Sequence, residues 1–144
     1  MKMKNIFLLI TGLFFSFIIN AQKSINALNG YKYVYVPVLV YDDGRVDIWG
    51  ISDKINKAFT DKGFTVITSL ERAKEISKVD PCSIVDCTIS HTNVTVGTNS
   101  VTLTMRNCKD EIIYSNTGRA MGLSMQDDFN KATRRAFGDI AEFK

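Results

Sequence analysis

Histidine, cysteine and proline are all scarce in this chain of 144 residues, and their scarcity narrows the classes of protein to consider. The chain has one histidine, His91, and three cysteines, none of them in a Cys-x-x-Cys pair. Zinc sites are built from closely spaced cysteine and histidine ligands, so the sequence predicts no metal site. Serine-hydrolase, zinc-protease and phosphate-cradling glycine motifs are also missing. The sequence therefore predicts no catalytic residues, no cofactor-binding residues and no cofactor.

An excess of one charge is lacking as well. The 18 basic residues face 15 acidic ones, and Lys2 and Lys4 lie in a segment that we expect to be removed. That leaves 16 basic residues against 15, scattered along the chain. A nucleic-acid-binding protein needs a concentrated basic surface, so this class is not favoured.

A hydrophobic run long enough to cross a membrane is absent. The longest run, Ile6–Ile19, has 14 residues, whereas a spanning helix needs roughly 20. It follows the basic Met1–Lys4 and precedes Ala21, which is the layout of a cleaved signal peptide. We expect residues 1–21 to be the signal peptide and residues 22–144 to form one globular domain, periplasmic or secreted. No cysteine lies at the cleavage point, which argues against a lipid anchor.

Three cysteines in an oxidising compartment allow one internal disulfide and leave one thiol. Cys87 alternates with the apolar residues of its expected strand, whereas Cys82 and Cys108 have the opposite, polar parity. The alternation favours a Cys82–Cys108 disulfide, which would stabilise the fold by about 3–4 kcal/mol. A β-bulge between these positions would make a Cys87–Cys108 pair feasible instead.

Periodicity predicts the first elements. Residues 31–41 alternate as a strand, and Pro37 in it indicates an edge or a bulge, because proline cannot donate to a ladder. Its tyrosines, Tyr31, Tyr33 and Tyr35, share one face, and its valines, Val34, Val36, Val38 and Val40, share the other. From residue 47 the apolar period becomes helical until Gly63, a natural helix stop. A short strand over 64–68 follows, then a short helix over 69–76.

The second half of the chain predicts a meander and a final helix. Strands are expected over 83–96 and 100–107, with a return strand starting at Ile112, and Ser124 with Asp127 resembles a capping box before an amphipathic helix. The order is β-α-β-(α)-β-β-β-α. We therefore predict an α/β (α+β) fold with a mixed sheet of about five strands and two main helices on one face.

Few residues are candidates for chemistry. His91 could act as a general base, but no motif supplies a partner, so a solvated or hydrogen-bonded strand histidine is favoured. The acidic stretch from Asp42 to Asp47 lacks calcium-loop spacing and is better explained by a turn and a helix cap.

The tyrosine row has two interpretations. Tyr31, Tyr33 and Tyr35 form a binding face if the helices cover the valine side of the sheet. Alternatively, their rings brace neighbouring side chains on a half-exposed face.

Short motifs connect the chain to known groups. It resembles small secreted or periplasmic Bacteroidetes proteins of unknown function, a resemblance carried by six segments: residues 33–37, Lys62-Gly63-Phe64, Cys82, residues 107–110, residues 112–114 and the alanine-rich stretch 131–137. More distantly, the layout is similar to the amino-terminal domain of TolB and to curli-secretion and penicillin-binding-protein-activating lipoproteins. That resemblance implies a binding or assembly module and no catalytic residues.

Two functional hypotheses follow. The first is a non-enzymatic envelope protein that binds or assembles with an envelope protein or a cell-wall partner, through a strand edge or the tyrosine face, in an oligomeric state that the sequence leaves open. The alternative is a small periplasmic hydrolase or ligand-binding enzyme with His91 or Asp86 in a pocket.

Overall fold

The computed structural model describes residues 28–68, 79–94, 97–122, 124–138 and 140. One five-stranded sheet runs through it in the order β2-β1-β3-β4-β5. The strands are β1 (Tyr33–Tyr35), β2 (Thr65–Ile67), β3 (Ile84–Val94), β4 (Thr98–Arg106) and β5 (Ile112–Met121). The helices are α2 (Ile51–Asp61), α4 (Met125–Phe137) and the short 3₁₀ helix η1 (Pro81–Ser83). The predicted element order is confirmed over these residues.

The sheet is mixed, as predicted. Strand β1 pairs in parallel with β2 on one side and with β3 on the other. Strands β3, β4 and β5 form an antiparallel meander. The long α2 crossover suits the parallel pair, and the short connections suit the hairpins.

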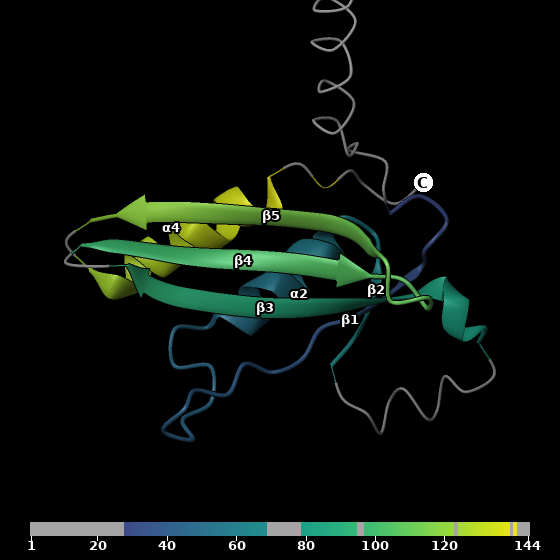
Figure 1. The fold of residues 1–144 in the computed structure, drawn as a ribbon, viewed down its shortest axis with the longest axis horizontal. Coiled ribbons are helices and arrows are strands. Elements are labelled where there is room, and N and C mark those ends of the chain that lie inside the picture. The colour runs from purple at the N-terminus through teal and green to yellow at the C-terminus, as the bar shows by residue number, and fades with distance from the viewer. Residues whose placement is uncertain (1–27, 69–78, 95–96, 123, 139, 141–144) are drawn as a thin grey trace, which may run out of the picture.

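Both helices lie on the same face of the sheet, behind β3–β5 in Figure 1. The core lies between the helices and the sheet, and its fully buried side chains include Phe59 and Phe129 from the helices and Val34, Val85 and Leu103 from the strands. Helices with a single apolar stripe can bury it only against one sheet face, which accounts for the two-layer arrangement.

Helix α2 has clear start and stop signals. It begins after Gly50, whose φ of 61° is left-handed. Asp47 caps it, because its carboxylate accepts the amides of Ile51 at 2.7 Å and Asp53 at 3.2 Å. Gly63, with φ of 90°, follows the last turn. The predicted cap and stop are therefore both present, although the helix starts four residues after Asp47.

Helix α4 crosses β5 with almost no space between the backbones. A Cβ atom on Gly118 would stand 1.8 Å from the Ala132 carbonyl oxygen. Two β5 side chains reach the end of the helix, where backbone carbonyls lack helical partners. The Tyr114 hydroxyl donates to the Ala136 carbonyl at 2.7 Å, and the Asn116 amide donates to the same carbonyl at 3.1 Å. These contacts lock α4 against the edge strand.

Several predicted details are wrong. The first strand ends at Tyr35 rather than at residue 41. The edge or bulge expected at Pro37 is absent, because β1 lies between two strands and Pro37 lies beyond its end. Ser124 precedes α4 but makes no side-chain capping bond.

Two further predictions are not tested. The signal peptide over 1–21 and the short helix over 69–76 fall outside the described residues.

Candidate interaction surface

The structure separates the three predicted tyrosines. Tyr33 and Tyr35 lie in β1 and are half-buried on the side opposite Val34. Tyr31 precedes the strand and packs against the hydrophobic core. Strand β1 is interior to the sheet, so Tyr33 and Tyr35 stand between β2 and β3 rather than along an edge.

The valines of the predicted first strand also have different environments. Val34 and Val36 are fully buried, but Val38 is 47% exposed and Val40 is 60% exposed. Val40 pairs with Val46 in an isolated antiparallel bridge, and Val46 is also 60% exposed. We call residues 38–46 the valine hairpin. Its apolar alternation continues the core pattern of β1 beyond the point where the sheet can bury it.

Hydrogen bonds hold the base of the valine hairpin on α2. The Leu39 amide donates to the buried Ser52 hydroxyl at 2.8 Å, and the Asp47 amide donates to the Leu39 carbonyl at 2.8 Å. Halfway along, the Tyr41 ring packs edge-on against His91 of β3, with 4.7 Å between the ring centroids. Burial raises the pKa of the Tyr41 phenol, and the Asp47 charge adds to the effect. The exposed valines are therefore presented by an anchored hairpin.

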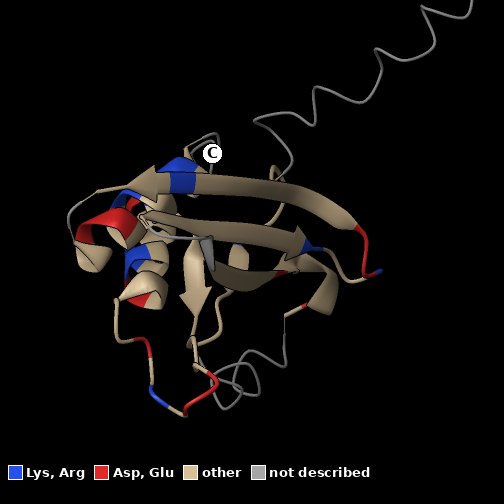
Figure 2. Ribbon diagram, turned by 60° about the vertical axis from the view of Figure 1, so that its left-hand side comes forward, with Lys and Arg blue, Asp and Glu red and all other residues tan. Residues whose placement is uncertain are grey.

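The hairpin tip is a closed turn. The Tyr41 amide donates to the Arg45 carbonyl at 2.9 Å, and Gly44 takes a φ of 80°. The Asp43 carboxylate accepts the Arg45 side chain at 2.6 Å and the Arg45 amide at 3.0 Å, and these bonds lower the pKa of Asp43. In Figure 2 this loop carries both charge colours, below the helices. Its acidic residues serve a turn and a helix cap, in agreement with the sequence interpretation.

The two residues of the enzyme hypothesis do not converge. His91 lies on the helix side of β3, between the rings of Tyr41 and Phe129. Asp86 is five positions earlier in the same strand, so it points to the opposite face, where partial burial raises its pKa. Within the described residues, no group of three histidine, cysteine or acidic side chains is placed to hold a metal ion.

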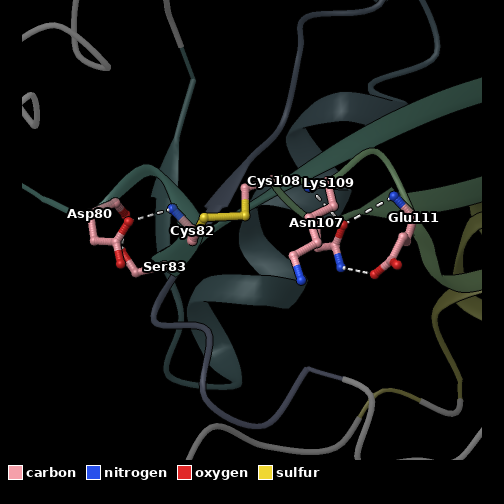
Figure 3. Close-up of a disulfide and its surroundings, with 7 residues drawn as sticks. All are labelled: Asp80, Cys82, Ser83, Asn107, Cys108, Lys109 and Glu111. Carbon is pink, nitrogen blue, oxygen red and sulfur yellow. Dashed lines mark hydrogen bonds between the residues drawn. A yellow bond between two sulfur atoms is a disulfide. The ribbon is translucent and has the colours of Figure 1, made fainter.

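The disulfide joins Cys82 to Cys108, with 4.9 Å between the Cα atoms, and Cys87 is a buried free thiol. The bond ties η1, before β3, to the turn after β4 (Figure 3). Asp80 accepts the Cys82 amide at 2.9 Å, and Asn107 accepts the amides of Lys109 at 2.9 Å and Glu111 at 3.0 Å. The predicted Cys82–Cys108 pairing is therefore confirmed, although both cysteines lie just outside the strands.

The sheet face opposite the helices carries many threonine and serine hydroxyl groups on β3, β4 and β5. Side chains of facing strands pair across it: Thr92 with Ser100 at 2.5 Å, Thr102 with Thr117 at 2.7 Å and Thr104 with Ser115 at 3.3 Å. Among the described residues, no helix covers this face. The Thr102–Thr117 and Thr104–Ser115 pairs are exposed, whereas the Thr92–Ser100 pair is partly buried.

Sequence reasoning missed two features. One is the valine hairpin, although an alternating segment followed by Asp-Asp-Gly and another valine is typical of a hairpin. The other is a groove of about 310 Å³ between α2 and α4. On the α2 side it is lined by Lys54 and Ala58 of the helix and by Lys62 directly after it, whose four-residue spacing places them on one face.

Comparisons with known proteins identify the fold. No protein-family model matches the chain, and no curated protein matches it. A solved structure of PelC from Paraburkholderia phytofirmans, a dodecamer of a point variant, is similar with a TM-score of 0.54 and 11% identity, covering 81% of this chain and 92% of that one. A second PelC dodecamer structure from the same organism gives 0.51 and 11%, covering 81% and 90%.

This likeness shows a shared fold. The expected similarity to the TolB amino-terminal domain and to the curli-secretion lipoproteins is not confirmed by these matches. Among the described residues, no helix combines the length and apolarity needed to cross a membrane.

Proposed function

We propose that this chain is an exported, non-enzymatic assembly module that associates with further copies of itself through the valine hairpin. The observation that carries the proposal is the exposure of Val38, Val40 and Val46 on an anchored hairpin. Contiguous exposed apolar side chains cost free energy in water and mark association surfaces in soluble proteins.

The anchoring of the hairpin strengthens this interpretation. The Leu39 amide is hydrogen-bonded to the Ser52 hydroxyl, and the Tyr41 ring packs on His91. The valines therefore cannot turn inward without breaking these contacts. A preorganised surface loses little conformational entropy when it binds, which favours association.

The two similar structures support self-association as the mode of assembly, because both are dodecamers. An export signal over residues 1–21 and the Cys82–Cys108 disulfide suit an oxidising compartment, periplasmic or extracellular. The rival enzyme hypothesis loses support because His91 and Asp86 lie on opposite faces of the sheet.

The test is sedimentation velocity of the secreted chain over a wide concentration range, with intact disulfide. We expect concentration-dependent oligomers that dissociate in the Val40→Thr/Val46→Thr variant, since threonine keeps the β-branched shape but adds a hydroxyl. Met121→Thr is the matched control, because Met121 is 72% exposed in β5 and lies outside the hairpin. A chain that stays monomeric throughout, or oligomers that persist in the valine variant, would contradict the proposal.

The tyrosine face remains a prediction and is tested by crosslinking in the cell envelope together with sedimentation velocity. Tyr33→Ala with Tyr35→Ala removes its two strand residues. If this variant keeps its fold but loses an envelope partner captured by crosslinking, the tyrosine face is a second contact surface. If partners and oligomers are unchanged, these rings only brace the sheet.

A further inference from the structure

The groove between α2 and α4 lies on the outer side of the helix layer. The two helices run in parallel: Trp49, just before α2, stacks on Phe129 near the start of α4 at 5.8 Å, and Phe59 meets Phe137 at their other ends at 4.7 Å. Lys54 to Lys62 spans eight residues, so the groove extends about 12 Å along the helices.

Small side chains explain why the groove is open. Ala58 lies at the middle of its α2 wall, and Thr133 on the α4 wall turns its hydroxyl back to the Phe129 carbonyl at 2.7 Å. The apolar surface is completed at one end by Phe137, whose ring is wedged against Phe59. A volume of about 310 Å³ is at the lower end of the range of small-ligand pockets, about 300–1,000 Å³.

Three cations line this apolar groove: Lys54, Lys62 and Arg134. Lys54 is committed to the backbone, because its ammonium donates to the carbonyls of Trp49 at 3.1 Å and Gly50 at 3.3 Å. The ammonium of Lys62 lies 5.8 Å from the centre of the Phe137 ring. Neither Lys62 nor Arg134 forms an ion pair with another described residue, whereas Lys57 on the outer side of α2 is paired with Asp61.

We propose that this groove binds a small amphipathic carboxylate, with its carboxylate group at Lys62 and Arg134 and its apolar body over Phe137 and Ala58. Two cations that have no ion-pair partner among the described residues, beside an apolar floor, match a molecule that is anionic at one end and apolar along its length. Arginine and lysine together offer several donors to the two carboxylate oxygens. In Figure 2, basic positions lie on both helices. The site is separate from the valine hairpin and does not depend on self-association.

The experiment uses decanoate as the probe and the secreted chain with its disulfide intact. Titration followed by amide chemical shifts should saturate at one decanoate per chain and perturb residues of both groove walls. Decanol, which has the same chain without the charge, should bind about tenfold more weakly or worse, since the carboxylate contacts are lost.

Two variants test the site, one by removing its charge and one by filling its volume. Lys62→Ala with Arg134→Ala removes the two cations that have no ion-pair partner and should weaken decanoate binding about tenfold or more while leaving decanol binding unchanged. Ala58→Leu fills the groove and should abolish binding of both probes. Lys57→Ala is the matched control, because it removes a lysine of the same helix that does not line the groove. This variant should bind decanoate as the unaltered chain does.

Several results would overturn the proposal. These are an absence of saturable decanoate binding, equal affinity for decanol and decanoate, or undiminished affinity in the double variant. If Ala58→Leu does not fold, as judged by its circular dichroism, the variant that combines Lys62→Ala with Arg134→Ala still tests the proposal.

Discussion

At the scale of single residues, burial determines the chemistry of the remaining thiol. Cys87 lies on the helix side of β3, only 3% exposed, among core side chains. Burial, reinforced by the Asp86 charge, raises its pKa from 9.0 to about 12. A thiolate is the reactive form of cysteine, so we expect this buried thiol to be unreactive in the folded protein.

We predict that Cys87 resists a thiol-labelling reagent at neutral pH until the chain is unfolded in denaturant without reductant.

The pKa of Cys87 is higher in the folded state than in the unfolded state. The contribution of this thiol to the free energy of unfolding is therefore complete below pH 9.0 and is lost as the pH rises toward about 12. The free energy of unfolding should therefore fall with pH in this range by a few kcal/mol more than in Cys87→Ala, on the order of 1.4 kcal/mol per pKa unit. In the labelling experiment, rapid modification of Cys87 in the native chain would show that the thiol is accessible and would contradict the first prediction.

At the scale of elements, the contact between α4 and β5 depends on the absence of a side chain. Gly118 faces the backbone of α4, and its missing Cβ leaves room for the carbonyl of Ala132 and the amide of Ala136. The helix contributes small residues at the same crossing. This close approach allows Tyr114 to reach the end of α4 with its hydroxyl.

We predict that Gly118→Ala lowers the free energy of unfolding by about 3 kcal/mol or more, because backbone atoms rather than flexible side chains must move. Urea unfolding measures the loss. Gly138→Ala is the control: Gly138 has a helical φ of −53°, and its new Cβ would make an ordinary 3.5 Å contact with the Arg135 carbonyl. The control should be neutral or slightly more stable. Equal stability of Gly118→Ala and the unaltered chain would mean that α4 is not held this closely.

At the scale of the whole molecule, one small domain has three different surfaces. These are the sheet face that carries the paired hydroxyls and the two tyrosines of β1, the valine hairpin that we propose for self-association, and the groove between the helices that we propose as a ligand site. The disulfide closes the end of the β3–β4 pair, where the chain leaves the sheet. A covalent bond between residues 26 positions apart restricts the unfolded chain and so stabilises the whole domain.

We predict that Cys82→Ser with Cys108→Ser lowers the free energy of unfolding by about 3–4 kcal/mol, measured by urea unfolding without reductant. Reduction of the unaltered chain should have a similar effect, because both sulfurs belong to exposed residues. Reductant should leave the stability of the double variant unchanged, which serves as the control. If reduced and oxidised chains unfold at the same urea concentration, the bond does not contribute to stability.

The sequence by itself determined the element order and the mixed sheet with its helices on one face, and it favoured the observed disulfide pairing over Cys87–Cys108. These follow from local rules: the period of apolar residues, glycine at helix ends, and the parity of the three cysteines relative to the apolar residues of the predicted strands. Each depends on neighbours in the chain, and the sequence records neighbours directly.

Only the tertiary structure decided where that local pattern stops being buried. Val34 and Val40 belong to one alternating run, but β1 has partners only as far as Tyr35, so Val34 is core and Val40 is surface. His91 and Asp86 lie on opposite faces because side chains alternate along β3, but only the tertiary structure decided that His91 is the one facing the helices, where its ring meets Phe129 of α4. The groove exists because Ala58 and Phe137, which are 79 positions apart, line the same space. Such contacts depend on the packing of distant segments, which periodicity does not record.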